Sequence, residues 1–129
     1  MDMIRYPTQV KDDEAKAAVI SAQVSTKKSA LLCRKIRGMN LQKAKAFLED
    51  LIAKKRDIDG KHYTNTAIGL LELLRSAESN AEFKGLDKEK LKIRMITAEK
   101  GPTRRRRKRR RSFGSKLKST HLKVVLSKV

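Results

Sequence analysis

The chain has 129 residues, of which 39% are hydrophobic and only 4% aromatic, which predicts one domain with a small core of aliphatic side chains. Its formal net charge of +19, from 33 Lys and Arg against 14 Asp and Glu, predicts a polyanionic partner, with nucleic acid ahead of an anionic membrane. A single cysteine excludes an internal disulfide and fits a reducing compartment, and we expect neither a signal peptide nor a membrane-spanning segment.

The N-terminal part of the chain predicts a loose lead-in followed by a strand. Residues 1–17 are polar and mixed in charge, and we expect them to be extended. The sequence AAVISAQV at 17–24 is short, apolar and β-branched, which is typical of a strand. Because side chains alternate across a strand, Ile20, Ala22 and Val24 are predicted to share one face.

A first helix is predicted between Ser25 and Gly38. Ser25 or Thr26 can cap its N-terminus, and a glycine commonly stands where a helix stops. At about 100° per residue, the buried face consists of Ser29, Leu32, Cys33 and Ile36, with the cysteine acting as a small buried hydrophobe. The opposite face carries the bases Lys27, Lys28, Arg34, Lys35 and Arg37. These bases are candidate nucleic-acid contacts, and the helix dipole alone also favours the last three.

A second helix is predicted to follow at once. Asn40 is expected to cap a helix over 41–57, and Gly60 marks the turn after it. Its apolar positions at helical spacing are Leu41, Ala44, Leu48, Leu51 and Ile52.

A third helix is predicted to begin at Thr64 or Asn65. It ends with a glycine C-cap at Gly85, and Leu86 is placed for the hydrophobic contact that often accompanies such a cap. Its buried stripe is predicted to consist of Ala67, Leu70, Leu71, Leu74, Ala77 and Ala81.

Two alternating segments near the C-terminus predict paired strands around a basic loop. In 91–100 one face consists of Leu91, Ile93, Met95 and Thr97, and in 121–129 one face consists of Leu122, Val124 and Leu126. Residues 101–118 would then form a long basic β-hairpin extension. The predicted fold class is α+β, with three helices packed on a small antiparallel three-stranded sheet. The globular body is expected to comprise 18–100 and 119–129.

The basic segment predicts RNA binding. Residues 101–129 carry twelve Lys and Arg and no acid, and eight of these bases are consecutive. Extended residues rise about 3.3 Å each and a nucleic-acid strand carries a phosphate about every 3.4 Å, so the charge densities nearly match. Because neighbouring charges repel, we expect a disordered tip in the absence of a partner. Arginine pairs bidentately with phosphate and stacks on bases, which favours structured RNA.

Candidate RNA contacts in this segment are Thr103, Arg104, Arg105, Arg106, Arg107, Lys108, Arg109, Arg110, Arg111, Phe113, Lys116 and Lys118. Phe113 would either stack on a base or anchor the hairpin. A nuclear-import signal and a solvated tail are rival explanations of the basic run, and the flanking strands argue against the tail.

The sequence shows no catalytic motif. It contains no Walker loop, dinucleotide-binding turn or nucleophile elbow, so we expect no enzyme, no cofactor and no metal. His62 lies in a predicted turn and His121 begins a strand, and with one cysteine they are too few for an ordinary zinc site. We expect His121 to make a hydrogen bond or to contact RNA. The helical carboxylates are predicted to form surface ion pairs, and they are Glu49, Asp50, Glu72, Glu78 and Glu82.

Several segments resemble one ribosomal family over residues 18–129. The combination of IRGM (36–39), SAESNAE (76–82) and TH (120–121) is similar to the universal large-subunit ribosomal protein twenty-two, called protein seventeen in the older eukaryotic naming. The resemblance implies a non-catalytic, cytoplasmic protein that binds large-subunit ribosomal RNA, aids assembly and has large-subunit proteins as neighbours. It also implies a hairpin that helps line the polypeptide exit tunnel beside the nascent polypeptide.

The resemblance adds candidate contacts on the body. Lys27, Lys28, Arg37 and Asn80 match family positions, and Arg94 is a further candidate. The family tip usually interleaves bases with Pro, Ala, Phe and Gly, whereas this chain has a nearly pure arginine run. The main alternative is a chromatin-like double-stranded DNA-binding protein, and a membrane-active peptide carrier is a weaker one; we expect no membrane partner.

Overall fold

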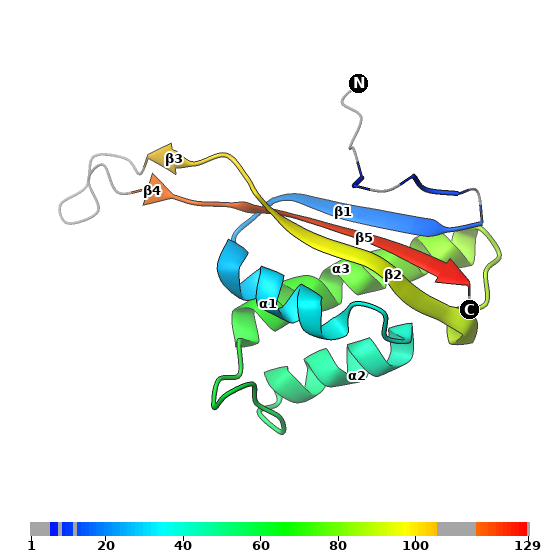
Figure 1. Cartoon of the computed structure of the whole chain (residues 1–129), viewed down its shortest axis with the longest axis horizontal. Helices are drawn as coiled ribbons and strands as arrows, with labels where there is room; N and C mark the ends of the chain where they lie inside the picture. The colour runs from blue at the N-terminus through cyan, green and yellow to red at the C-terminus, as the bar shows by residue number, and fades with distance from the viewer. Residues whose placement is uncertain (1–5, 8, 12, 106–115, 129) are drawn as a thin grey trace.

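The computed structural model describes residues 6–7, 9–11, 13–105 and 116–128. In chain order, its elements are β1 (Ala15–Ala22), α1 (Thr26–Ile36), α2 (Leu41–Ile52), α3 (Thr64–Phe83), the 3₁₀ helix η1 (Lys88–Lys90), β2 (Leu91–Lys100), β3 (Arg104–Arg105), β4 (Lys116–Leu117) and β5 (Thr120–Lys128). The strands β1, β5 and β2 form an antiparallel sheet in that order, and the three α-helices cover one face of it (Figure 1). The predicted α+β class, with three helices on a three-stranded antiparallel sheet, is confirmed.

Local side-chain chemistry begins the first two helices as predicted. The Ser25 side chain accepts a hydrogen bond from the Lys28 backbone N–H, and the Asn40 side chain accepts one from the backbone N–H of Gln42. Each cap satisfies one backbone donor that the first helical turn leaves without a partner. Gly38 has φ of +83°, a left-handed conformation that glycine adopts without steric cost, and it lies in the corner between the two helices.

The second helix is shorter than predicted. It ends at Ile52 rather than reaching 57, because Lys54 adopts a left-handed conformation with φ of +62°. The backbone N–H of Lys55 then donates to the carbonyl oxygen of Asp50 at 2.9 Å, which closes the helix with a Schellman bond. Periodicity could not show this stop, since lysine is an ordinary helix former and gives no stop signal.

The third helix starts differently from the prediction and ends in agreement with it. Its N-cap is Tyr63 and not Thr64 or Asn65, which are the first two helical residues. Tyr63 has φ of +47° and makes no side-chain cap bond. At the other end, Gly85 has φ of +78° and the backbone N–H of Leu86 donates to the carbonyl oxygen of Ala81 at 2.9 Å, so the predicted glycine C-cap is confirmed.

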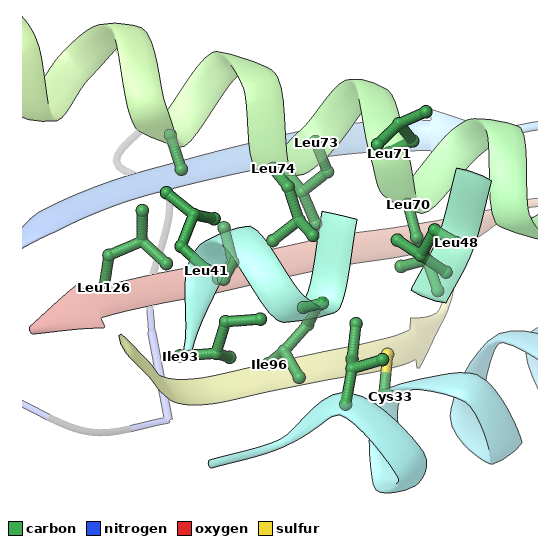
Figure 2. Close-up of a cluster of buried hydrophobic side chains, with 14 of the residues drawn as sticks. Cys33, Leu41, Leu48, Leu70, Leu71, Leu73, Leu74, Ile93, Ile96 and Leu126 are labelled. Atoms are coloured by element: carbon green, nitrogen blue, oxygen red, sulfur yellow. The ribbon is translucent and has the colours of Figure 1, made fainter. Parts of the chain in front are cut away.

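The core lies between the helices and the covered face of the sheet (Figure 2). The predicted apolar faces of the three helices are buried there, except that Ile52 of α2 is only partly buried. The whole predicted stripe of α3 is buried, and Thr66 and Leu73 are buried with it. Burying each such leucine stabilises the fold by about 1.5–3 kcal/mol relative to exposing it. Cys33 is 1% exposed, and burial raises the pKa of its thiol to about 11 although Arg37 lowers it in part. The interpretation of Cys33 as a buried hydrophobe is confirmed.

The first strand departs from the predicted alternation. It begins at Ala15, so residues 15–17 belong to the sheet rather than to the lead-in. The pairing with β5 is irregular between Val19 and Ala22, and Ser21 has φ of +59°. This bulge returns Ala22 to the core side and leaves Ile20 50% exposed, so the predicted common face of Ile20 and Ala22 is wrong.

The second strand has the predicted bounds and a shifted face. Leu91 and Ile93 point into the core, but a bulge lies between Ile93 and Met95. After it, Ile96 and Ala98 face the helices, so the predicted common face of Leu91 and Ile93 with Met95 and Thr97 is wrong. One extra residue in a strand reverses the alternation beyond it. In β5, the predicted common face of Leu122, Val124 and Leu126 is confirmed as part of the core.

Candidate nucleic-acid interface

The basic segment leaves the body from paired strands. The ladder between β2 and β5 continues to Lys100 opposite Thr120. Beyond it, β3 pairs with β4, with Arg104 opposite Leu117 and Arg105 opposite Lys116, and this pair points away from the helices (Figure 1). Arg106, Arg107, Lys108, Arg109, Arg110, Arg111 and Phe113 lie outside the described residues. The long hairpin extension and the disordered tip therefore stay predictions beyond the β3–β4 pair.

The base of this segment is closed by tight backbone contacts. The backbone N–H of Gly101 donates to the carbonyl oxygen of Ser119 at 2.9 Å, and the Ser119 hydroxyl donates to the carbonyl oxygen of Pro102 at 2.8 Å. A Cβ atom at Gly101 would lie 2.6 Å from the Ser119 hydroxyl oxygen and 3.1 Å from its carbonyl oxygen. Glycine is therefore required here for close approach of the two limbs.

The same base is tied to the start of α1. Thr120 is fully buried, and its hydroxyl donates to the carbonyl oxygen of Val24 at 2.8 Å. The hydroxyl oxygen of Thr26 lies 2.6 Å from that of Thr120. Because these bonds join β5 to the beginning of the helix, the start of β5 and the basic face of α1 have a fixed relative position.

The basic face of α1 has no acidic neighbours that neutralise it. Lys27, Lys28, Arg34 and Lys35 are all exposed. Within the described parts of the chain, no hydrogen bond or ion pair engages the charged group of any of them. The first turn of α1 contains no acid, so Lys27 and Lys28 add positive charge at the positive end of the helix dipole. That placement costs stability in the isolated protein and favours an anionic partner.

Several bases elsewhere on the body are paired with acids. Lys45 of α2 forms an ion pair with Glu78 of α3, and Arg75 lies 3.9 Å from Glu49. Arg56 pairs with Asp50, and Lys88 pairs with both Glu82 and Glu78. The predicted ion pairs of the helical carboxylates are therefore confirmed, except that Glu72 has no such pair among the described residues. By contrast, none of the four exposed bases of α1 has an acidic partner among the described residues.

Two predicted contact residues bridge elements of the body. The guanidinium of Arg37 donates to the carbonyl oxygen of Ile96 at 2.9 Å, which ties the end of α1 to β2. The side-chain amide of Asn80 donates to the carbonyl oxygen of Lys16 at 2.7 Å, which ties α3 to β1. These bonds give both side chains a structural role. Because both side chains are also exposed, contact with RNA stays a prediction for each.

Two others are engaged on the uncovered face of the sheet. Arg94 forms an ion pair with Glu14, which is 3% exposed, and donates to the carbonyl oxygen of Gln9 at 2.9 Å. His121 Nδ1 accepts a hydrogen bond from the backbone N–H of Ser21 at 3.0 Å, so the expected hydrogen bond of His121 is confirmed. This bond satisfies the backbone of the β1 bulge. RNA contact by Arg94 or His121 stays a prediction.

No metal or membrane feature accompanies these surfaces. In the ranges that the structure describes, no group of three or more His, Cys, Asp and Glu side chains could hold a metal ion. None of the helices in those ranges combines the length and the apolar character needed to cross a bilayer.

Comparison with known proteins identifies the family. The model of the family described as ribosomal protein L22p/L17e matches residues 17–127. The chain belongs to this family. All candidate contact residues named above lie within the range matched by the L22p/L17e family, and the resemblance drawn from the IRGM, SAESNAE and TH segments is confirmed.

Archaeal members of the L22p/L17e family are similar to the chain over nearly its full length. The large ribosomal subunit protein uL22 of Methanosphaera stadtmanae is 37% identical, and the alignment covers 94% of each chain. The protein of the same name from Ignicoccus hospitalis is 38% identical, with 89% of this chain and 88% of the relative covered. That of Methanocaldococcus jannaschii is 33% identical, with 98% and 96% covered.

Proposed function

We propose that this protein is a structural constituent of the large ribosomal subunit, in the cytoplasm, and that it binds large-subunit ribosomal RNA. The single observation that carries the proposal is membership of the L22p/L17e family, together with relatives named large ribosomal subunit protein over nearly the whole chain. The exposed bases on α1, which have no acidic partner among the described residues, agree with such a partner.

Electrostatic attraction supplies the binding energy in this proposal. RNA segments repel one another where they meet, and an acid-free segment with eight consecutive bases would reduce that repulsion. Each phosphate contacted releases condensed counterions, so the affinity falls with salt by a slope of about 0.7–0.9 per contact on logarithmic axes. The seven arginines of the run add bidentate phosphate contacts and stacking on unpaired bases. Duplex DNA offers phosphates but no unpaired bases.

The segment 101–118 is proposed to continue the β3–β4 pair into the RNA and to help line the polypeptide exit tunnel. A hairpin of these 18 residues has limbs of about nine residues, which reach at most about 30 Å when extended. Its tip would lie beside the nascent polypeptide, with other large-subunit proteins as neighbours. By joining separate RNA segments, the protein would also aid assembly of the subunit.

The proposal is tested by competition binding and by incorporation. At several salt concentrations, the full chain is expected to prefer large-subunit RNA of Methanosphaera stadtmanae to duplex DNA of equal phosphate content. An epitope-tagged copy, expressed in an archaeal cell depleted of its own relative, is expected to sediment with the large subunit. Equal affinity for the two nucleic acids, with no tagged protein in the subunit fraction, would favour the double-stranded DNA alternative.

A further inference from the structure

A pocket lies between α1 and the loop that joins α2 to α3. It has a volume of about 410 Å³, and the side chains that matter here are Lys27, Lys28, Leu31, Arg34, Lys61 and Tyr63. The start of α1, this loop and the β3–β4 pair lie at the same end of the molecule (Figure 1). Pockets of roughly 300–1,000 Å³ hold small ligands, so the space suits one nucleotide and not a duplex.

The walls of the pocket are strongly cationic. Lysine and arginine side chains reach it from two elements far apart in sequence, with Lys27, Lys28 and Arg34 on α1 and Lys61 on the loop. Among the described residues that line it, none is acidic. No hydrogen bond or ion pair within the described ranges engages the charged group of Lys61, as is also true of the three bases on α1. The pocket therefore concentrates positive charge around one small space.

The pocket also has an apolar lining. Leu31 of α1 and the ring of Tyr63 both line it and are only partly buried against the core. Tyr63 holds a left-handed backbone conformation with φ of +47°, which is uncommon for a bulky residue. Strained residues of this kind persist where the surrounding structure fixes them and cluster at ligand sites. Cations beside an aromatic surface form the combination that binds an unstacked base together with its phosphate.

The loop is ordered by its own bonds, so the pocket is preformed. Ile58 and Lys61 exchange backbone hydrogen bonds of 2.8 and 3.0 Å around Asp59 and Gly60, whose φ values are +52° and +80°. Positive φ at both central residues is the type I′ turn, for which Asp-Gly is a preferred pair. Ile58 is 7% exposed and anchors this turn in the core. Lys61 and Tyr63 are therefore presented without a large ordering cost on binding.

We propose that this pocket binds a single unpaired nucleotide of the ribosomal RNA, with its base against Leu31 and Tyr63 and its phosphates against the four surrounding cations. The inference rests on the proposed function and adds to it a defined recognition site on the body, separate from the arginine-rich segment. The pocket thus contributes selectivity for exposed bases, whereas the arginine-rich segment contributes affinity for phosphate.

The first test maps contacts by photocrosslinking. The full chain is bound to Methanosphaera stadtmanae large-subunit RNA substituted with 4-thiouridine, irradiated, and digested for peptide mass spectrometry. Crosslinked nucleotides are expected on the peptides that contain Tyr63 and Leu31, at positions that chemical probing finds unpaired. Crosslinks confined to 101–118, or body crosslinks only to base-paired nucleotides, would overturn the pocket while leaving ribosomal RNA binding intact.

The second test compares matched variants in the same full chain. Tyr63→Leu removes the ring and is expected to lose about 5- to 100-fold in affinity for that RNA, and Tyr63→Phe, which keeps a ring, is expected to lose less. Lys61→Ala is expected to weaken binding more than Lys55→Ala, an equal charge change on an exposed lysine of the same loop that does not line the pocket. Equal losses for the two lysine variants would overturn the pocket even if Tyr63→Leu failed to fold. Failure of the parent chain to prefer the RNA would instead refute the proposed function, and the pocket with it.

Discussion

Gly101 and Ser119 lie so close together that a Cβ at position 101 would force Ser119 to shift. Their backbones are joined by a 2.9 Å hydrogen bond, and the space where a Cβ would stand is already filled by the Ser119 hydroxyl and carbonyl. These two residues form the point where the basic segment separates from the sheet. The packing there therefore helps to direct the β3–β4 pair away from the body.

Gly101→Ala is expected to destabilise the protein by about 1–3 kcal/mol, the usual cost of overpacking a filled site. Thermal unfolding followed by circular dichroism measures it. In the Gly101→Ala and Ser119→Ala double variant the 2.6 Å contact is removed, so the loss should be smaller than the sum of the two single losses. Additive losses would show that the alanine methyl group does not meet the hydroxyl.

Arg94→Ala is expected to destabilise the fold by about 2–4 kcal/mol, because it leaves the carboxylate of Glu14 buried without its cation. Urea unfolding at neutral pH provides the free energy of unfolding. Adding Glu14→Gln removes the buried charge, so part of the lost stability should return. If Arg94→Ala leaves stability unchanged yet weakens RNA binding, Arg94 is an RNA contact and not a structural residue.

Cys33 predicts a specific pH dependence. Because burial raises the pKa of its thiol to about 11 from an ordinary value of 9.0, the folded state holds this proton more tightly than the unfolded state does. The contribution of the protonated thiol to the stability of the fold is fully present below about pH 9 and is lost as the pH rises towards about 11. The difference in unfolding free energy between the parent and Cys33→Ala should therefore shrink across this range. A constant difference would contradict the shift.

Lys54→Gly is expected to stabilise the protein by up to about 1 kcal/mol, because glycine adopts the left-handed conformation at the end of α2 without strain. Lys54→Ala removes the same charge but keeps a Cβ, so it serves as the matched control and should not stabilise. Differential scanning calorimetry measures both. A similar change in the two variants would mean that charge, and not backbone conformation, determines the effect.

Replacing Arg106, Arg107, Arg109 and Arg110 with serine is expected to leave the unfolding temperature unchanged and to reduce the salt slope of RNA binding by about 3–4. Subunit assembly should be impaired in cells that carry only this variant. The matched change of the same four residues to lysine keeps the charge but loses bidentate pairing, so it should retain the slope and lose affinity. Normal subunit yield with the serine variant would count against the proposed function.

Features determined by short stretches of sequence were predictable. The caps at Ser25 and Asn40, the glycine stop at Gly85 and the buried helix faces depend on residues within one or two turns, and the structure confirms them. The end of α2 and the start of α3 were mispredicted because Lys54 and Tyr63 adopt left-handed backbone conformations that their side chains do not favour.

Features that depend on distant partners were not predictable. The bulges in β1 and β2 arise from pairing with β5, and an alternating pattern cannot show where a residue is inserted. The bonds of Arg37 to Ile96 and of Asn80 to Lys16 span 59 and 64 residues, so no local pattern distinguishes such a side chain from an RNA contact. The basic stripe of α1 was visible in the sequence. The pocket that it forms with Lys61 could be recognised only from the fold, because the two elements are far apart in the chain. The Asp59-Gly60 pair does, however, signal the turn that precedes Lys61.

Under the proposed function, the buried hydroxyl of Thr120 would constrain how bound RNA segments are placed during ribosome assembly. Since it bonds to Val24 and lies against Thr26, the start of β5 cannot tilt without moving the first helix. Two stretches of RNA captured at these places would be held at one mutual spacing and angle. In a precursor particle with any other spacing, the protein could bind only one of the two RNA stretches. Binding of both stretches at once would therefore select correctly folded intermediates.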